Sequence, residues 1–327
     1  MWSTILGHQK PIEQLRKALA TRRLPNAYLF SGLSGIGKKL VATTFVSALF
    51  CPKSPDVCGS CISCSKIRNR SHPDVFFIEP KTEKILIEQV RDLKQNLQFH
   101  PLEGAIKIAV IDDADAMTEA AANSLLKILE EPPQSTHFIL ITAFTHRILP
   151  TIRSRCQKIV FAPLPEEDVT QYLIGQRGFD QRQALRIAQI SQGSIGSVAE
   201  LDPEFIDDVM SRFTRLLGNA NAADIIAVSE AWAQEGDRVP LVFDLLMCFY
   251  RDLLCYRSTG IRVGFLSAAE PSLQGDGSAI MGTGRVSIKK LENAITSIAR
   301  ARDALFTTAN KQLLFEQLLF TLTSSSV

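Results

Sequence analysis

A glycine-rich stretch, GLSGIGKK at residues 32–39, is the first segment whose residue types and spacing could do chemistry. In the pattern G-x-x-x-x-G-K-[ST], backbone N–H groups surround the phosphates of a nucleotide, the Lys reaches the β- and γ-phosphates, and the final hydroxyl binds Mg²⁺. Gly32, Gly37 and Lys38 satisfy this pattern, and Gly35 lies between them. The segment therefore predicts a loop that can hold phosphate groups.

The last position of the loop departs from the pattern. Lys39 stands where a Ser or Thr would bind the metal, and an ammonium group only donates hydrogen bonds, so it cannot be a metal ligand. It would lie as a like charge beside Mg²⁺. We therefore expect a degenerate nucleotide site, and the sequence leaves open whether ATP or ADP binds there.

A nucleotide site also needs a carboxylate at the end of a neighbouring strand, to hold Mg²⁺ and to polarise water. Asp112 and Asp113 follow the apolar run 106–111 and could supply it. An active enzyme of this kind usually carries Glu at the second position, and Asp113 is one methylene shorter. The predicted site also includes Thr142, which ends another apolar run. In the alternative interpretation, the two carboxylates only cap a strand at the surface.

Four of the seven cysteines form the pattern C-x6-C-x2-C-x2-C. Tetrahedral zinc takes four thiolates, and the two C-x2-C steps give tight turns that direct sulfur atoms to one centre. With no free position, such a site is structural and not catalytic. The insertion at residues 51–64 has almost no apolar core of its own, so a metal would hold it together. The predicted ligands are Cys51, Cys58, Cys61 and Cys64, and the scattered Cys156, Cys248 and Cys255 are expected to be buried thiols.

Short apolar runs alternate with helical patterns in the first half of the chain. Continuous apolar strands separated by helices indicate a parallel sheet that is covered on both faces. The phosphate loop lies between one such run, 27–30, and a helical pattern that begins at Lys38, so the N-terminus of that helix would face a phosphate. We predict a doubly wound α/β domain of P-loop type over residues 1–162.

The strand pattern stops after Ala162, where Pro163 and Pro165 follow. Residues 163–202 predict a small helical lid domain, and 203–327 an all-α domain, because apolar residues recur there at helical spacing. Residues 258–287 are dense in glycine, which disfavours helix and strand, and we expect a mobile loop of unknown role.

The composition is that of an ordinary globular protein, with 46% hydrophobic residues, 21% charged residues and a formal net charge of +2. This balance gives no general argument for binding to nucleic acid or a membrane. The charged N-terminal segment excludes a secretory signal, and no run reaches the roughly 18 apolar residues of a membrane span. We expect a cytoplasmic protein with reduced thiols.

Three stretches resemble a known family: NAYLFSGLSGIGKK (26–39), VIDDADAMTEAAANSLLKILEEPP (110–133) and LPTIRSRCQ (149–157). With the cysteine insertion between the first two, they closely resemble the clamp-loader subunits of bacterial DNA polymerase III. The resemblance is specific over residues 5–165 and moderate over 166–201, and beyond that it rests on length and helical character. It implies an AAA+ ATPase-type domain with a zinc-binding insertion, a helical lid and a helical collar domain that joins subunits.

The resemblance also implies partners and a role for one arginine. Clamp-loader subunits form a ring of five that contains gamma/tau and delta subunits, and this ring places the sliding clamp on primed DNA as part of the polymerase holoenzyme. ATP is hydrolysed between neighbours, and the Arg of an S-R-C motif is donated to the adjacent site. Ser154, Arg155 and Cys156 match that motif, so Arg155 would be an arginine finger acting in trans, with Arg153 as a competing donor.

The departures from the family pattern all weaken hydrolysis. An active lid supplies an Arg shortly after a Gly-Ser pair, but the residues that follow Gly193 and Ser194 include no Arg before Val198. Together with Lys39 and Asp113, this predicts a subunit without ATPase activity of its own. Two alternatives remain open: an active gamma/tau-type ATPase in which Asp112 alone holds the metal, and a zinc-dependent DNA-binding module formed by residues 51–72. The last lacks interleaved aromatic residues and a basic recognition helix.

Overall fold

The computed structural model describes residues 1–198, 203–219, 221–261, 287–305 and 310–324. These residues form two compact units. The α/β unit contains Met1–Asp168 and Ser194–Gly196, and the helical unit contains Val169–Gly193 and the chain from Ser197 onward. The three-part division at 162 and 202 stays a prediction. Most of the glycine-rich segment 258–287, namely 262–286, lies outside the described residues.

A parallel sheet forms the centre of the α/β unit, with the strand order β2-β3-β4-β1-β5. The strands are β1 (Ala27–Ser31), β2 (Val75–Ile78), β3 (Lys107–Ile111), β4 (Thr136–Thr142) and β5 (Gln157–Val160). The apolar run of this segment, residues 159–161, begins two residues after the start of β5. Gln157 and Lys158 pair with β1 but are exposed on an edge strand, so hydropathy alone misses them.

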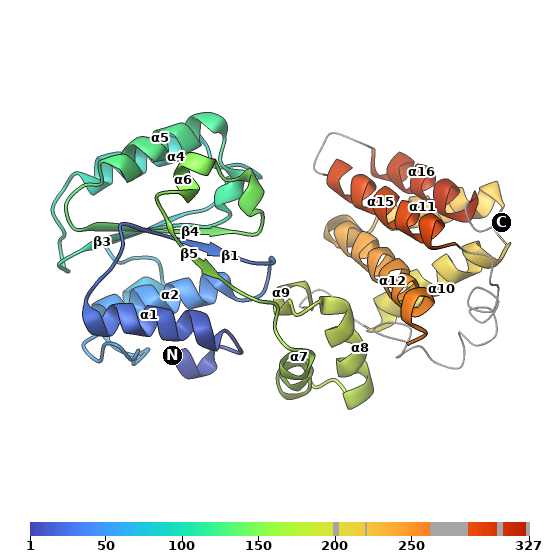
Figure 1. Ribbon diagram of the computed structural model, residues 1–327, viewed down its shortest axis with the longest axis horizontal. Helices are drawn as coiled ribbons and strands as arrows, with labels where there is room; N and C mark the ends of the chain where they lie inside the picture. The colour runs from blue at the N-terminus through green and yellow to red at the C-terminus, as the bar shows by residue number, and fades with distance from the viewer. Residues whose placement is uncertain (199–202, 220, 262–286, 306–309, 325–327) are drawn as a thin grey trace. The chain divides into compact units, whose positions relative to one another are not determined.

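Helices cover both faces of this sheet (Figure 1). One face is covered by α1 (Gln9–Thr21) and α2 (Lys38–Phe50), and the opposite face by α4 (Ile87–Leu97), α5 (Glu119–Glu130) and α6 (Pro150–Arg153). The unit also contains α3 (Ile62–Arg68) and short 3-10 turns at Trp2–Thr4, Ala114–Ala116 and Thr145–Arg147. The predicted two-faced parallel sheet is thus confirmed.

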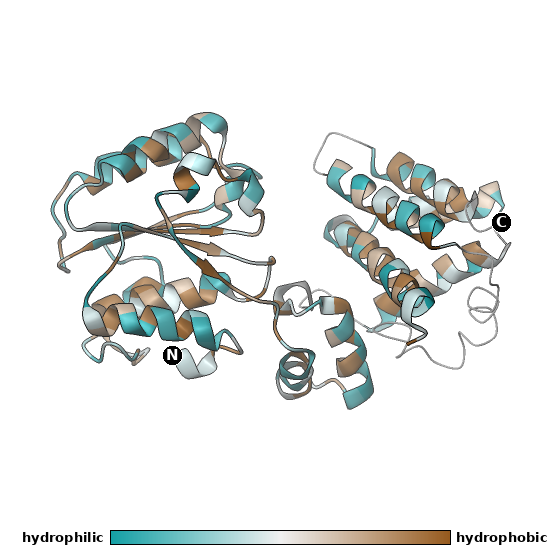
Figure 2. Ribbon diagram, in the orientation of Figure 1, coloured by the Kyte–Doolittle hydropathy of each residue, from teal (hydrophilic) through white to brown (hydrophobic). Residues whose placement is uncertain are grey.

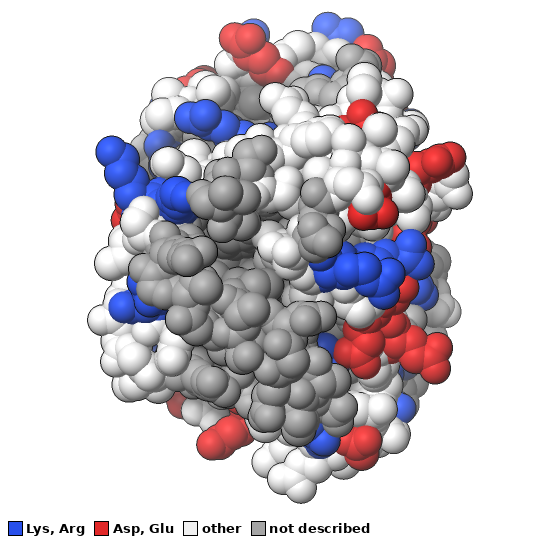
Figure 3. Space-filling model, turned by 90° about the vertical axis from the view of Figure 1, so that its right-hand side faces the viewer, with Lys and Arg blue, Asp and Glu red and all other residues white. Residues whose placement is uncertain are grey.

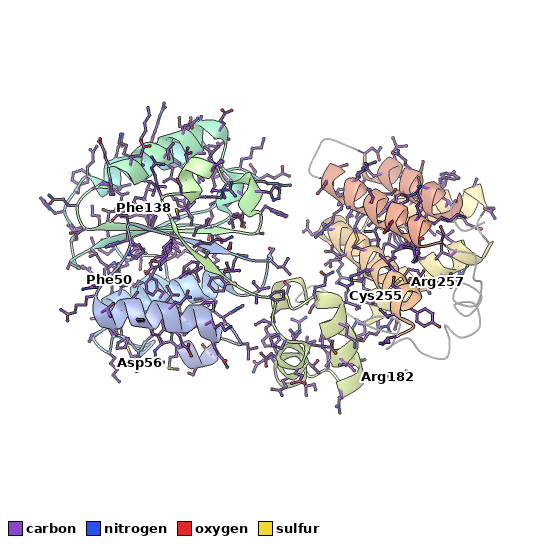
Figure 4. All side chains as sticks on the ribbon, in the orientation of Figure 1. Phe50, Asp56, Phe138, Arg182, Cys255 and Arg257 are labelled. Atoms are coloured by element: carbon purple, nitrogen blue, oxygen red, sulfur yellow. The ribbon has the colours of Figure 1, made fainter. Side chains whose placement is uncertain are left out.

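Alternate residues of each strand enter the two halves of the core. Phe30 and Ile141 pack on the side of α2, whereas Phe138 and Leu140 pack on the side of α5, where Figure 4 labels Phe138. The strands are largely hydrophobic, while the outer faces of the helices are hydrophilic (Figure 2). Burial of each such side chain contributes roughly 1.5–3 kcal/mol. The rigid sheet therefore fixes the carboxyl ends of its strands, where the candidate site lies.

The helical unit is built from two packed helix pairs. Helix α12 (Val239–Thr259) packs on α15 (Ile288–Ala304), and α11 (Ala222–Ala233) packs on α16 (Lys311–Ser324). The rings of Phe243 and Phe315 stack with their centroids 4.6 Å apart. Its other helical segments are α8 (Gln181–Ser191), α10 (Pro203–Asn219), a π-helical turn at Leu173–Arg177 and a 3-10 turn at Gly236–Arg238. Two further helices, α7 (Glu166–Tyr172) and α9 (Ile195–Val198), contain residues of both units.

The surface charges are mixed. On the face drawn in Figure 3, Lys and Arg side chains lie next to Asp and Glu side chains. This agrees with the net charge of +2. Among the residues described on that face, the charge distribution gives no argument for binding to a polyanion.

Candidate functional site

The phosphate loop connects β1 to α2 at the carboxyl edge of the sheet, so strand, loop and helix follow in the predicted order. The N–H of Gly32 donates to the carbonyl of Thr142 at 3.3 Å, which ties the start of the loop to β4. A Cβ atom on Gly32 would lie 2.5 Å from the carbonyl oxygen of Phe161, so only glycine fits there. Helix α2 begins at Lys38, and its first N–H groups have no partner within the helix.

Each carbonyl oxygen of residues 32–36 accepts a hydrogen bond from elsewhere in the chain. Lys38 Nζ donates to Gly32 (2.8 Å) and Leu33 (2.6 Å), Ser194 Oγ to Ser34 (2.8 Å), the N–H of Gly196 to Gly35 (2.8 Å), and His8 Nε2 to Ile36 (2.6 Å). We refer to these five acceptors as the carbonyl row. These hydrogen bonds from within the chain fix the backbone of the loop.

Lys38 is buried, with 6% of its surface exposed. Burial lowers the pKa of its ammonium group, and the carboxylates of Asp113, Asp112 and Asp115 act in the opposite direction. None of these carboxylates forms an ion pair with Lys38, whose donors go to the carbonyl row. Its side chain is therefore positioned by the loop itself.

Lys39 forms an ion-pair network with residues at the ends of two strands. Its ammonium lies 2.5 Å from Glu79 Oε1 and 3.0 Å from Asp112 Oδ2, and Arg70 contacts both oxygens of Glu79 at 2.8 Å. Partial burial acts to lower the pKa of Lys39, but the hydrogen bonds with Glu79 and Asp112 hold it above its ordinary value. The contact with Arg70, and then that with Lys39, lower the pKa of Glu79 to about 2. Glu79 is therefore ionised at neutral pH and pairs with the charged Lys39 and Arg70.

The other predicted site residues have different fates. Asp112 follows β3 and reaches Lys39, whereas Asp113 is exposed and has a left-handed backbone conformation with φ of 45°. The hydroxyl of Thr142 donates to Asp115 and accepts from the N–H of Phe144, while its carbonyl oxygen accepts from the N–H of Gly32. The structure thus brings Asp112 to the loop but directs the Thr142 side chain elsewhere.

Several residues of the site were missed from the sequence. Glu79 follows the apolar strand β2 directly, so the rule that found Asp112 could also have found it. His8 donates through Nε2, since a carbonyl can only accept, and burial lowers its pKa. Ser194 was noted only as part of the Gly-Ser pair, and its contact with the loop, like that of Gly196, carries no local signal because the partners lie about 160 residues earlier in the chain.

The four clustered cysteines converge on one point. Their sulfur atoms all lie within 4.8 Å of one another, with 3.6 Å between Cys51 and Cys58 and 4.0 Å between Cys58 and Cys64. Tetrahedral zinc with Zn–S bonds of about 2.3 Å places its sulfur ligands roughly 3.8 Å apart. The cluster therefore has the dimensions of a four-thiolate metal site.

Backbone N–H groups point at the sulfur atoms of this cluster. Those of Cys58, Cys61 and Cys64 donate to the preceding cysteine sulfur at 3.5, 3.3 and 3.5 Å. The N–H groups of Ser60 and Cys61 lower the pKa of Cys58 to about 6, whereas burial raises that of Cys64 to about 12. Four thiolates so close together need a cation, and the donor set fits a metal ion such as zinc.

The cysteine insertion is anchored to the main core. Val57 and Ile67 are buried in the core on the side of α2, together with Cys51 and Cys64. Trp2 Nε1 donates to the carbonyl of Pro55 at 2.9 Å, and Asp56, labelled in Figure 4, pairs with Arg16 of α1 at 2.9 Å. The insertion thus lacks a core of its own but shares that of the α/β unit. Of the other thiols, Cys248 is buried and Cys156 and Cys255 only partly so.

Arg155 lies just after α6, on the exposed side of the unit. Its guanidinium donates to the carbonyl of Thr151 at 2.9 Å and lies 2.9 Å from Glu130 Oε1 at the end of α5. About two fifths of both side chains is exposed, 38% for Arg155 and 44% for Glu130. Such an exposed pair contributes at most about 1 kcal/mol, so the guanidinium can exchange this partner for another.

Comparison with known proteins identifies the family. The sequence profile described as "DNA polymerase III, delta subunit" matches residues 7–165. A DNA polymerase III subunit delta' from Pseudomonas aeruginosa is 33% identical over 244 residues, which are 72% of this chain and 73% of that protein. The chain belongs to the delta-prime family of DNA polymerase III. Its five-stranded parallel sheet and the glycine loop between β1 and α2 agree with the predicted doubly wound α/β domain of P-loop type.

Two further relatives define the extent of this likeness. The delta' subunit of Bacillus subtilis is 29% identical to this delta-prime family member over 329 residues, 94% of each chain. A subunit tau/gamma from Haemophilus influenzae is 30% identical over 240 residues, 69% of this chain, but the chain spans only 35% of that relative. In the described part of the chain, no helix has both the length and the apolar character needed to cross a membrane.

Proposed function

We propose that this delta-prime family member is a non-hydrolysing subunit of the clamp loader of DNA polymerase III. In this role it joins gamma/tau and delta subunits in a hetero-pentameric ring that loads the sliding clamp on primed DNA. Family membership supports the clamp-loader role. We further propose that residues 1–162, 163–202 and 203–327 are its AAA+, lid and collar domains, and that it works in the cytoplasm.

The single observation that carries the non-hydrolysing role is the ion pair between Lys39 and Asp112 at 3.0 Å. A hydrolysing site needs that carboxylate to hold Mg²⁺. In addition, Asp113 is exposed, and the segment over the loop tip, Ser194–Gly196, carries no Arg. Three parts of the catalytic machinery are therefore altered at once.

The absence of hydrolysis is testable with the isolated chain. Steady-state assay is expected to give no ATP turnover above background, and Lys39→Ser alone is expected to give none, because Asp113 and the missing lid Arg remain. Robust turnover by the wild-type chain would instead favour the second candidate, an active gamma/tau-type ATPase. The glycine loop and Lys38, which match the phosphate-binding pattern, are the features that favour this second candidate.

The proposal gives Arg155 a task on a neighbouring subunit. In phosphoryl transfer, an Arg supplied by a neighbour stabilises charge on the transferring group and contributes on the order of 10³ to 10⁵ in rate. The planar guanidinium makes paired contacts that Lys cannot reproduce. The exposure of Arg155 and its weak pairing with Glu130 leave it free to be donated.

Arg153 is the matched control, since it is exposed and lies two residues away. In a reconstituted complex, Arg155→Ala is expected to leave assembly intact and to lower ATP turnover at one partner site by about 10³ or more. Arg153→Ala is expected to leave turnover within a small factor of wild type. If Arg153→Ala abolishes turnover and Arg155→Ala does not, the wrong arginine is assigned, and if neither changes it, the donor role fails.

We also propose that the cysteine cluster holds one structural Zn²⁺. The convergence of four sulfur atoms supports this, and the absence of a free coordination position argues against catalysis. Zinc would fix the insertion against α1 and α2.

A further inference from the structure

The ammonium group of Lys39 lies beside the phosphate loop, close to the carboxylate that ends β3. Lys39 is the second residue of α2 and occupies the place in the pattern that otherwise carries the metal-binding hydroxyl. Its ammonium reaches the carboxyl end of β3 and contacts Asp112 at 3.0 Å. Asp112 is the carboxylate that would otherwise help to hold a divalent cation. The positive charge of Lys39 therefore lies where a divalent cation would lie in a nucleotide site that binds metal.

We infer that Lys39 is a built-in replacement for the divalent cation, and that it alone excludes metal–nucleotide complexes from this loop. The inference goes beyond the proposed function, which concerns hydrolysis and the donated arginine. It assigns Lys39 as the residue that determines which form of a nucleotide the loop can accept. A metal-free phosphate group stays compatible with the site, and a metal–phosphate complex does not.

The glycine loop itself is ready for phosphate groups. Every carbonyl oxygen of the carbonyl row accepts a hydrogen bond, and two of these bonds come from Lys38. The backbone of Gly32 packs so closely on Phe161 that no side chain would fit between them. None of these features depends on Lys39. Removal of the Lys39 ammonium would therefore leave a formed loop with the Asp112 carboxylate released.

Glu79 and Arg70 direct Lys39 to this position. The Lys39 side chain is 45% exposed and could extend into water, but Glu79 holds its ammonium at 2.5 Å. Glu79 is fixed in turn by two contacts with Arg70, whose guanidinium lies 5.5 Å above the ring of Phe77. A chain of contacts thus runs from Arg70 through Glu79 and Lys39 to Asp112. A lone surface pair has no such support.

The test uses the full-length chain with Mn²⁺ and ADP as the probe. Mn²⁺ replaces Mg²⁺ at oxygen ligands, and electron paramagnetic resonance distinguishes its free and bound forms. In Lys39→Thr the missing hydroxyl is restored. This variant is expected to bind Mn²⁺ in the presence of ADP at least tenfold more tightly than the wild type does.

Two controls locate that gain. Lys127→Thr removes the same charge from an exposed position of α5, on the opposite face of the sheet, and is expected to bind as the wild type does. Adding Asp112→Asn to Lys39→Thr is expected to remove the gain, because the released carboxylate is lost. Thermal unfolding of each variant verifies that it is folded.

The inference is overturned if the wild type binds Mn²⁺ with ADP as tightly as Lys39→Thr does. It is equally overturned if Lys39→Thr is folded and gains nothing, since then another feature excludes the metal. A gain that survives Asp112→Asn would place the metal elsewhere and also overturn it. Should Lys39→Thr fail to fold, Lys39→Ser takes its place with the same criteria.

Discussion

The phosphate loop and the cysteine cluster belong to the same α/β unit but solve the problem of charge in opposite ways. Each gathers groups that carry negative charge when ionised: Asp112 and Glu79 at the loop, and four thiols in the insertion. At the loop, the chain supplies its own cations, Lys39 and Arg70. In the cluster, the sulfur atoms contact one another and backbone N–H groups.

This difference in charge balance indicates which of the two sites needs a metal ion. Where the chain itself balances the charge, a metal has neither free ligands nor an electrostatic reason to enter. Where it does not, the thiolate state is reached only with a cation, and metal binding becomes part of folding. The comparison therefore predicts that metal removal affects the insertion and leaves the loop unchanged.

Loss of a cysteine ligand should have the largest effect. In Cys64→Ser the zinc content is expected to fall well below one equivalent per chain. The insertion should be destabilised by about 3–5 kcal/mol. This is a fraction of the binding free energy of structural zinc in small domains, which is roughly 10–16 kcal/mol. Elemental analysis gives the metal content, and the fluorescence of Trp2, which donates to Pro55, reports on the insertion.

Cys255→Ser is the matched control, since Cys255 lies outside the cluster in α12 (Figure 4). This variant should retain the metal. All variants are made in a Trp232→Phe background, so that the fluorescence comes from Trp2 alone. Wild-type protein with much less than one zinc per chain would refute the assignment of the cluster.

Two glycines with the same backbone angle allow a direct comparison of the two regions. Gly35 in the loop and Gly59 in the insertion both have φ of +72°. A Cβ on Gly35 would lie 2.4 Å from Ser194 Oγ and 2.9 Å from Gly196 Cα, whereas one on Gly59 meets nothing within 4 Å. Left-handed strain costs about 1–2 kcal/mol and overpacking about 1–3 kcal/mol more.

Gly35→Ala should therefore lower the free energy of unfolding by about 2–5 kcal/mol, and Gly59→Ala by only about 1–2 kcal/mol. Urea denaturation of the two variants, followed through Trp2, measures both values. Equal losses would show that the contact of the loop with Ser194 and Gly196 contributes nothing.

The smallest effect concerns acid. Because the contacts with Arg70 and Lys39 lower the pKa of Glu79 from 4.5 to about 2, its carboxylate stabilises the folded state above pH 4.5. This contribution is lost as the pH falls from 4.5 to about 2, the range between the unfolded and folded pKa values. Glu79 is partly exposed, so screening limits the effect to about 1 kcal/mol or less.

Glu79→Gln should accordingly be slightly less stable than the wild type at neutral pH and equally stable near pH 2. Unfolding free energies measured at a series of pH values test this convergence. A difference between the two proteins that does not change with pH would mean that the charge of Glu79 is not what stabilises the network.

Sequence reasoning succeeded where the signal is local. Apolar runs located the strands, and the glycine pattern and cysteine spacing located the loop and the cluster. It placed Lys39 beside a metal as a like charge, but the structure pairs Lys39 with Asp112 itself. That pairing depends on Glu79 and Arg70, which the fold brings in from other segments. The polar start of β5 was missed because an exposed edge strand has no apolar pattern.

The carbonyl row has a consequence for the order in which the protein is made. Ser34 and its donor Ser194 are 160 residues apart in the chain. At a synthesis rate of roughly 5–20 residues per second, Ser194 is added roughly 8–32 s after Ser34. Until then, the carbonyls of Ser34 and Gly35 have only water or transient partners. The glycine loop is thus among the first segments to leave the ribosome and among the last of the α/β unit to reach its final form.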